Sequence, residues 1–232
     1  MSMGALVRYE WETPVSKIPA GQSGRFHIIK RKCPAGTSFE TGEASGISEV
    51  LFTKDVIFTQ LKDDPLKKSI PWMSDTPMEY YSAVDLVTRT KGSRVLVGGL
   101  GLGLITHLLA NRMDIEEIVV VELEPDVIKL VEPSLPKKVK VIGGDFLKFL
   151  SMTEKAGDVY DTVIADIWKT GFEDADEELM RDCQMMMQDF QSTAEHLFWA
   201  FQHKIDEEEL SFAVHYLDRQ RIQLNVITTS GD

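Results

Sequence analysis

A turn near the middle of the chain has residue types and a spacing that suit backbone contact with a ligand. Gly99, Gly101 and Gly103 alternate with single residues directly after a short apolar run, and Leu100 lies within this turn. Glycines allow a sharp turn and leave no Cβ between the main chain and a bound group. Glu122 ends a second apolar run about 20 residues later, the offset at which an acid can bind two ribose hydroxyls. The pattern therefore predicts a site for an adenosine-containing cofactor.

The elements around these residues would hold them at one edge of a parallel sheet. Residues 95–97 and 118–121 are apolar runs typical of buried strands, and residues 104–111 have helical spacing. Strand, glycine turn, helix, strand and acid form the βαβ unit of adenosine cofactor sites. Leu104 stands where the third glycine of the dinucleotide pattern G-x-G-x-x-G would fall, so a dinucleotide is not favoured. A glycine turn without a ligand is the structural alternative, and Glu122 argues against it.

Strands and helices alternate along the rest of the chain, which predicts an α/β fold with a Rossmann-like, doubly wound, mostly parallel sheet. A helix is expected from Thr76, which can cap it, to Gly92, which can end it. The next expected elements are a helix at 124–131, a strand at 139–142, a short helix at 146–150, a strand at 160–165 and a helix at 174–190. The last ones are 196–201, a fifth strand or the end of that helix, then a helix at 206–219 and a strand at 222–228.

The first 75 residues differ from the rest, because Gly, Pro, Ser and Thr are frequent and apolar runs are short. Residues 25–29, 47–53 and 56–60 are expected as short strands, with a hairpin turn at 53–55 between the last two. We therefore expect two parts. Residues 1–75 would form a small N-terminal antiparallel β appendage, and residues 76–232 a Rossmann-like cofactor-binding domain.

The composition is that of an ordinary globular protein, with 43% apolar and 27% charged residues in 232. No apolar run reaches the roughly 18 residues that span a bilayer, and no secretory signal is visible, so we expect a cytoplasmic protein without membrane contact. A net charge of −12 argues against nucleic acid as a partner and favours a small cationic or neutral substrate. Cys33 and Cys183 have no metal-ligand spacing, so we expect free thiols and no metal. The oligomeric state is left open, with a homodimer as one alternative.

Four separated stretches together resemble the class I S-adenosylmethionine-dependent methyltransferases, and within that superfamily the spermidine synthase-like branch. They read V-L-V-G-G-L-G-L-G, V-V-V-E-L-E-P-D-V-I, G-G-D-F-L-K-F-L and Y-D-T-V-I-A-D, and the match covers about residues 47–168. The resemblance implies the class I methyltransferase fold and S-adenosylmethionine as cofactor. It also implies that Gly99, Gly101 and Gly103, with Leu100 between them, line the methionine and ribose part of the cofactor.

The resemblance assigns roles to residues beyond the turn as well. Glu122 would bind the ribose hydroxyls, and Leu123 would pack on the adenine. Asp145 would accept a hydrogen bond from the adenine amino group, while Phe146 would offer its backbone N–H. Asp166 would face the sulfonium and the acceptor.

Two positions depart from the aminopropyltransferases of that branch. Leu102 stands where they carry an Asp that holds the amine of the decarboxylated cofactor. Residues 166–169 read D-I-W-K instead of an Asp-Ser-x-Asp-Pro-like run, so only the first acid remains. These departures favour methyl transfer to a small molecule. An aminopropyltransferase and a non-catalytic protein that binds an adenosyl ligand are the alternatives.

Asp166 is the candidate catalytic residue, because a carboxylate there could steady the sulfonium or accept the acceptor's proton. A role in capping the following turn is its structural alternative. Trp168, Tyr80 and Tyr81 could shape an acceptor pocket, since aromatic side chains suit small organic ligands. For the tyrosines, packing in the core is the alternative.

Overall fold

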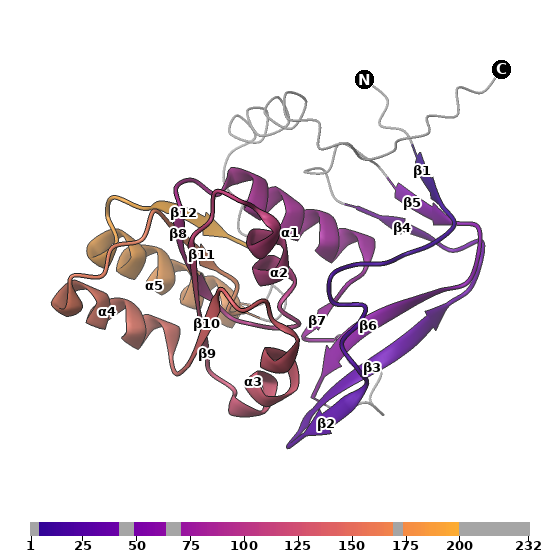
Figure 1. Cartoon of the computed structure of the whole chain (residues 1–232), viewed down its shortest axis with the longest axis horizontal. Helices are drawn as coiled ribbons and strands as arrows, with labels where there is room; N and C mark the ends of the chain where they lie inside the picture. The colour runs from indigo at the N-terminus through magenta and orange to yellow at the C-terminus, as the bar shows by residue number, and fades with distance from the viewer. Residues whose placement is uncertain (1–4, 42–48, 64–70, 169–173, 200–232) are drawn as a thin grey trace.

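A computed structural model describes residues 5–41, 49–63, 71–168 and 174–199 of the chain. In this part the chain forms a central five-stranded sheet and two smaller sheets built from the residues before the first helix (Figure 1). Every helix described is too short or too polar to cross a membrane. Cys33 and Cys183 are both buried, and neither forms a disulfide.

The central sheet is parallel throughout and has the order β10-β9-β8-β11-β12. Its strands are β8 (Arg94–Gly98), β9 (Glu117–Glu122), β10 (Val139–Gly143), β11 (Thr162–Ala165) and β12 (Glu195–Phe198). From β8 the chain first builds outward through β9 and β10, and it then returns to add β11 and β12 on the other side. The order therefore switches direction at β8, as in doubly wound Rossmann-like sheets. This confirms the predicted fold class. Within the expected segment 196–201, residues 196–198 belong to the fifth strand, β12, and not to the end of a helix.

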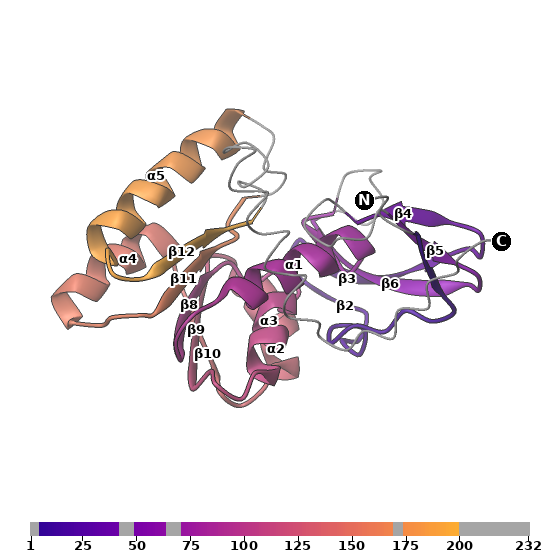
Figure 2. The same ribbon diagram turned by 90° about the horizontal axis from the view of Figure 1, so that it is seen from above.

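Helices cover both faces of this sheet (Figure 2). On one face lie α1 (Pro77–Arg89), α2 (Leu104–Asn111) and α3 (Pro125–Val131), which is followed by the 3₁₀ turn η2 (Glu132–Ser134); on the other lie α4 (Phe146–Ala156) and α5 (Asp174–Phe190). Strand side chains alternate between the two cores, as the pleat requires. The α1–α3 side takes Val95, Val97, Ile118, Val120 and Ile164, and the α4–α5 side takes Leu96, Val119, Val121, Val163 and Ala165. Because both faces are covered, the strands read as continuous apolar runs in the sequence.

The residues before α1 form two sheets. One has the order β1-β5-β4, and the other β2-β3-β6-β7. The strands are β1 (Ala5–Arg8), β2 (Gly21–Ser23), β3 (Phe26–Cys33), β4 (Ser38–Glu40), β5 (Glu49–Phe52), β6 (Val56–Lys62) and β7 (Met73–Ser74). All pairs are antiparallel except β1 with β5, which is parallel.

The predicted hairpin at 53–55 is wrong, because β5 and β6 belong to different sheets. The chain crosses from one sheet to the other at this point. Phe52 at the end of β5 and Phe58 in β6 meet edge to face, with ring centroids 5.7 Å apart, in a core shared by the two sheets. Burial of both rings therefore outweighs the local preference for a hairpin. The helix expected at 146–150 is longer than predicted, since α4 continues past Leu150 to Ala156. The helix expected at 206–219 and the strand expected at 222–228 lie outside the described residues.

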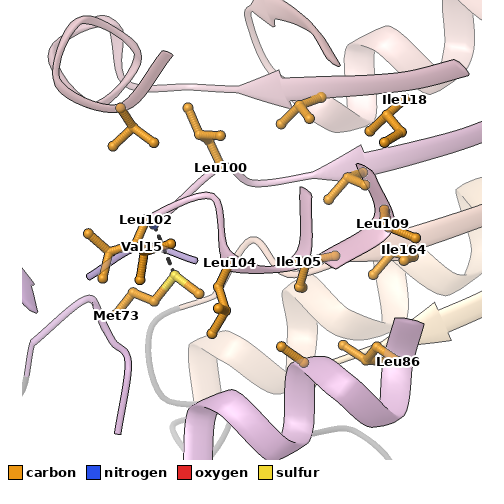
Figure 3. Packing of buried hydrophobic residues seen from close by; sticks show 14 of the residues in the cluster. Val15, Met73, Leu86, Leu100, Leu102, Leu104, Ile105, Leu109, Ile118 and Ile164 are labelled. Atoms are coloured by element: carbon orange, nitrogen blue, oxygen red, sulfur yellow. Dashed lines mark hydrogen bonds between the residues drawn. The ribbon is translucent and has the colours of Figure 1, made fainter. Parts of the chain in front are cut away.

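The β2-β3-β6-β7 sheet packs on α2 and α3 through a continuous apolar core. Phe26, Leu61 and Met73 belong to the same buried cluster as Leu104 and Val127. Met73 makes the closest approach, since its sulfur accepts a hydrogen bond from the Leu102 backbone N–H at 3.0 Å (Figure 3). The glycine turn is thus packed between the central sheet and this second sheet.

Candidate functional site

A cavity lies at the carboxyl ends of the central strands, where an open parallel sheet places its ligand. Its floor comes from Gly99 after β8, Glu122 at the end of β9, Gly144 after β10 and Asp166 after β11. The wall from the N-terminal sheet consists of Phe26, Leu61, Trp72 and Met73. The cavity therefore joins the predicted cofactor-binding residues with elements from the first 75 residues.

The glycine turn is shaped by close contacts as well as by its backbone angles. Gly99 has φ +89°, and a Cβ at this position would lie 2.0 Å from the Asp166 carbonyl oxygen. A Cβ at Gly101, where φ is +51°, would meet the Met73 sulfur at 2.4 Å. Gly99 and Gly101 line the cavity with bare backbone. Gly103 and Leu100 do not line it: Gly103 caps α2 in a left-handed conformation, and Leu100 is buried in the core.

Glu122 is held by two backbone donors. Its Oε2 accepts a hydrogen bond from the Leu100 N–H, and its Oε1 accepts one from the Glu124 N–H, both at 2.8 Å. Only 8% of the residue is exposed, and it lines the cavity. Each carboxylate oxygen can accept more than one hydrogen bond, so both keep capacity for a ligand's hydroxyls. The side chain also joins the glycine turn to the start of α3, which fixes the shape of the site before any ligand binds.

Three other predicted residues lie around the same cavity. Asp145 lines it while its Oδ1 accepts a hydrogen bond from the Lys148 N–H at 3.1 Å, so it caps α4 as well. Phe146 lies against Gly98, where an added Cβ would stand 2.7 Å from the ring. Leu123 is 67% exposed although it lines the cavity, so its side chain is free to pack on a flat ligand ring.

Two carboxyl groups in the cavity have pKa values well above the usual range for an acid. Burial, together with a smaller contribution from the negative charge of Glu122, raises the pKa of Asp166 to about 7. Burial, together with a smaller contribution from the negative charge of Asp166, raises the pKa of Glu79 to about 8. Such values suit groups that exchange protons near neutral pH. Glu79 was not among the predicted site residues, because an acid in the first turn of a helix is common and favourable there in its own right.

The stability of the unliganded protein should fall as the pH rises from about 5 to about 8. In this range the folded protein keeps protons on Glu79 and Asp166 that the unfolded chain has already lost. The stabilisation is complete below the unfolded pKa values of about 4 and is lost as the pH passes the folded values. Thermal unfolding of the wild type and Glu79→Gln at both ends of this range tests the expectation. The variant should lose less of its Tm with pH, and equal losses would contradict it.

The predicted aromatic residues divide into two groups. Trp168 lines the cavity, donates from its indole N–H to the Trp199 carbonyl oxygen at 2.9 Å and stacks on Phe198. Tyr80 and Tyr81 do not line the cavity. They pack around Trp11, with ring centroids 5.5 and 6.4 Å away, in the core shared by the N-terminal sheets. Successive helical residues are about 100° apart, so Glu79 and the two tyrosines point in different directions from α1. The two tyrosines therefore pack in the core and do not form part of the cavity wall, where an acceptor pocket was expected.

The charged residues that line the cavity, within the described part of the chain, are all acids: Glu79, Glu122, Glu124, Asp145 and Asp166. This lining favours a ligand that carries positive charge. Leu102 does not line the cavity, because its side chain is fully buried in the core (Figure 3). Among the described residues no cluster of His, Cys, Asp or Glu is arranged to hold a metal ion.

No protein-family model and no curated protein matches the chain. Among solved structures it is similar to a spermidine synthase in complex with the transition state analogue AdoDATO, with 14% identity and a TM-score of 0.47 over 75% of this chain and 54% of that one. It is also similar to precorrin 8W decarboxylase from Methanobacterium thermoautotrophicum (16% identity, TM-score 0.39, 62% of this chain, 72% of that one). A third is a SAM-bound amino pentose methyltransferase from Micromonospora echinaspora (23% identity, TM-score 0.34, 47% of this chain, 43% of that one). The chain thus spans about half the length of the first of these structures. These are distant likenesses of architecture, and the assignment of the site rests on the geometry above.

Proposed function

We propose that the protein binds S-adenosylmethionine in this cavity and transfers its methyl group to a small-molecule acceptor. The observation that carries the proposal is the Glu122 carboxylate, fixed by two backbone N–H groups at the end of β9 and directed into the cavity beside the bare backbone of Gly99 and Gly101. A buried acid with spare acceptor capacity fits the paired hydroxyls of a ribose.

The rest of the cavity fits the remaining parts of this cofactor. Leu123 and Phe146 offer apolar surface near Asp145, which has an acceptor for an exocyclic amino group. Asp166 lies next to Gly99 in the cavity, where a carboxylate would complement the sulfonium charge. Methyl transfer from a sulfonium is an in-line displacement, so alignment of acceptor, methyl and sulfur is the main task of the site.

Aminopropyl transfer is the less favoured alternative. It needs a carboxylate to hold the amine of the decarboxylated cofactor, and at that position Leu102 is buried in the apolar core with its backbone N–H bonded to Met73. A protein that binds an adenosyl ligand without turnover is the other alternative. The presence of Glu79 and Asp166, two carboxyl groups able to take up a proton near neutral pH, favours an enzyme.

Calorimetric titration with S-adenosylmethionine, S-adenosylhomocysteine and decarboxylated S-adenosylmethionine tests the proposal. The first two should bind, and Glu122→Ala should weaken both by roughly 10- to 100-fold, because hydrogen bonds to a charged group contribute about 1.5–3 kcal/mol. Glu117→Ala is the matched control. It removes an acid from the opposite end of β9, where Glu117 pairs with Arg94 outside the cavity.

Two results would overturn the proposal. One is an absence of binding by any of the three compounds to the wild type. The other is unchanged affinity in Glu122→Ala with circular dichroism showing a native fold. Tighter binding of the decarboxylated compound than of S-adenosylmethionine would instead replace methyl transfer by aminopropyl transfer.

A further inference from the structure

Two carboxyl groups from distant parts of the chain face the same cavity. Glu79 comes from the first turn of α1, and Asp166 directly follows β11. Within the described part of the chain, neither side chain makes a hydrogen bond or an ion pair. Both are partly exposed, and both line the cavity. It costs free energy to keep two carboxylates charged when they face a cavity without a partner. The pair is therefore stabilised by binding a proton or a ligand of opposite charge.

Among the described residues that line the cavity, the charged groups around the pair are all negative. Glu122 adjoins Asp166, and two backbone N–H groups stabilise its charge. Glu124 at the start of α3 and Asp145 at the start of α4 face the cavity from further along the same edge. Among the described residues, the N-terminal sheet, α5 and the residue after β12 contribute only uncharged side chains to the cavity: Phe26, Leu61, Trp72, Met73, Leu179 and Trp199. No cation among the described residues lines the cavity, so within this part of the chain a proton or a ligand is what can balance the charge of the pair.

We propose that Glu79 and Asp166 act as one pair that holds a proton while the cavity is empty, releases it when a sulfonium binds beside the pair, and takes up the acceptor's proton after methyl transfer. This inference rests on the proposed function and names the acceptor class. The acceptor is a nucleophile with a removable proton, an N–H or O–H group, rather than a thioether or a tertiary amine.

The step balances in atoms and charge. The lone pair of the acceptor nitrogen or oxygen forms a bond to the methyl carbon, the carbon–sulfur bond breaks, and its electron pair stays on sulfur. Sulfur becomes neutral, and the acceptor acquires the positive charge. The acceptor's proton then passes to a carboxylate of the pair. This restores the state that holds one proton, because the sulfonium that favoured full ionisation no longer exists.

Proton release on binding tests the pair without knowledge of the acceptor. S-adenosylmethionine and S-adenosylhomocysteine share their adenosine and amino-acid parts, but only the first carries a sulfonium. Calorimetric titrations near neutral pH, in buffers of different ionisation enthalpy, give the number of protons released by each compound. We expect S-adenosylmethionine to release roughly half a proton to one proton more per site than S-adenosylhomocysteine, since a nearby cation favours the ionised carboxylates.

Variants assign the proton to the pair. Glu79→Gln and Asp166→Asn should each remove most of the difference between the two compounds while still binding S-adenosylhomocysteine, which shows that the site is folded. Glu132→Gln, a change at an exposed acid in η2, should keep the full difference.

The outcomes separate the two proposals. If both compounds bind the wild type with the same number of released protons, the pair has no such role, while the cofactor assignment stands. A difference that persists in both variants would also overturn the role. If neither compound binds, the proposed function fails, and the pair's role fails with it.

Discussion

Replacing Gly99 with alanine should abolish binding of adenosyl compounds and lower the free energy of unfolding by at least about 3 kcal/mol. The Cβ would lie 2.0 Å from the Asp166 carbonyl oxygen, an atom of the main chain that cannot swing aside. The clash can be removed only if β8 and β11 move apart at their carboxyl ends. Gly98 and Ala165 are the last paired residues there, directly before the turn. Both Gly99 and Asp166 line the cavity, so the same shift would displace two sides of the site.

A second glycine separates this clash from backbone strain. Gly157 also has a positive φ, +70°, but nothing lies within 4 Å of the Cβ that alanine would add. Gly157→Ala should cost only about 1–2 kcal/mol, the penalty of the left-handed conformation, with ligand affinity unchanged. Urea unfolding and calorimetric titration of both variants measure the two effects. Similar losses of stability in the two variants, or normal binding in Gly99→Ala, would contradict the proposed geometry.

The part of the fold that could be predicted from the sequence is the part in which local pattern and tertiary environment agree. Strands β8, β9 and β11 are covered on both faces, so they appear in the sequence as continuous apolar runs. Glycine positions marked the turn after β8, where the structure needs positive φ and close backbone contact. Short helices between such strands then leave few alternatives to a doubly wound sheet.

The N-terminal sheets could not be predicted in the same way. Their strands are short, and the parallel pairing of β1 with β5 joins segments about 40 residues apart, which no local pattern announces. The turn at 53–55 had the composition of a hairpin. What decides its geometry is the joint burial of Phe52 and Phe58 against Trp11, a contact that exists only in the folded core.

The residues of the candidate site also fall into those that the sequence pattern predicts and those that it does not. Glu122 and Asp166 directly follow predicted strands, and Asp145 comes within three residues of another, so the topology of a parallel sheet was enough to expect them at one edge. Glu79 reaches the cavity through packing of α1 on the central sheet, and Trp72 and Met73 reach it through packing of the N-terminal sheet on α2 and α3. No spacing in the sequence connects them with the glycine turn.

Replacing Asp75 with alanine should destabilise the protein by about 3–5 kcal/mol, because it would leave several buried donors without an acceptor. Asp75 is fully buried. Its Oδ1 accepts a hydrogen bond from the Thr59 N–H at 2.6 Å, and its Oδ2 accepts from the Thr13 and Ser16 hydroxyls at 2.8 and 3.2 Å. Burial raises the pKa of this carboxyl group although these hydrogen bonds oppose the shift, so the site depends on its donors to keep the charge.

The effect should extend to the cavity, because Asp75 connects the N-terminal sheet to the helix that carries Glu79. It lies just before Thr76, the N-cap of α1, and its own N–H donates to the Thr59 carbonyl oxygen at 3.1 Å. Asp75→Asn keeps an acceptor for the Thr59 N–H, and its amide can donate to a hydroxyl, so a loss of about 1–2 kcal/mol is expected. Asp55→Ala, which removes an exposed acid paired with Lys32, should cost less than about 1 kcal/mol. Thermal and urea unfolding rank the three variants. If Asp75→Ala were as mild as Asp55→Ala, the N-terminal sheet would not depend on this carboxylate, and the position of Glu79 would need another support.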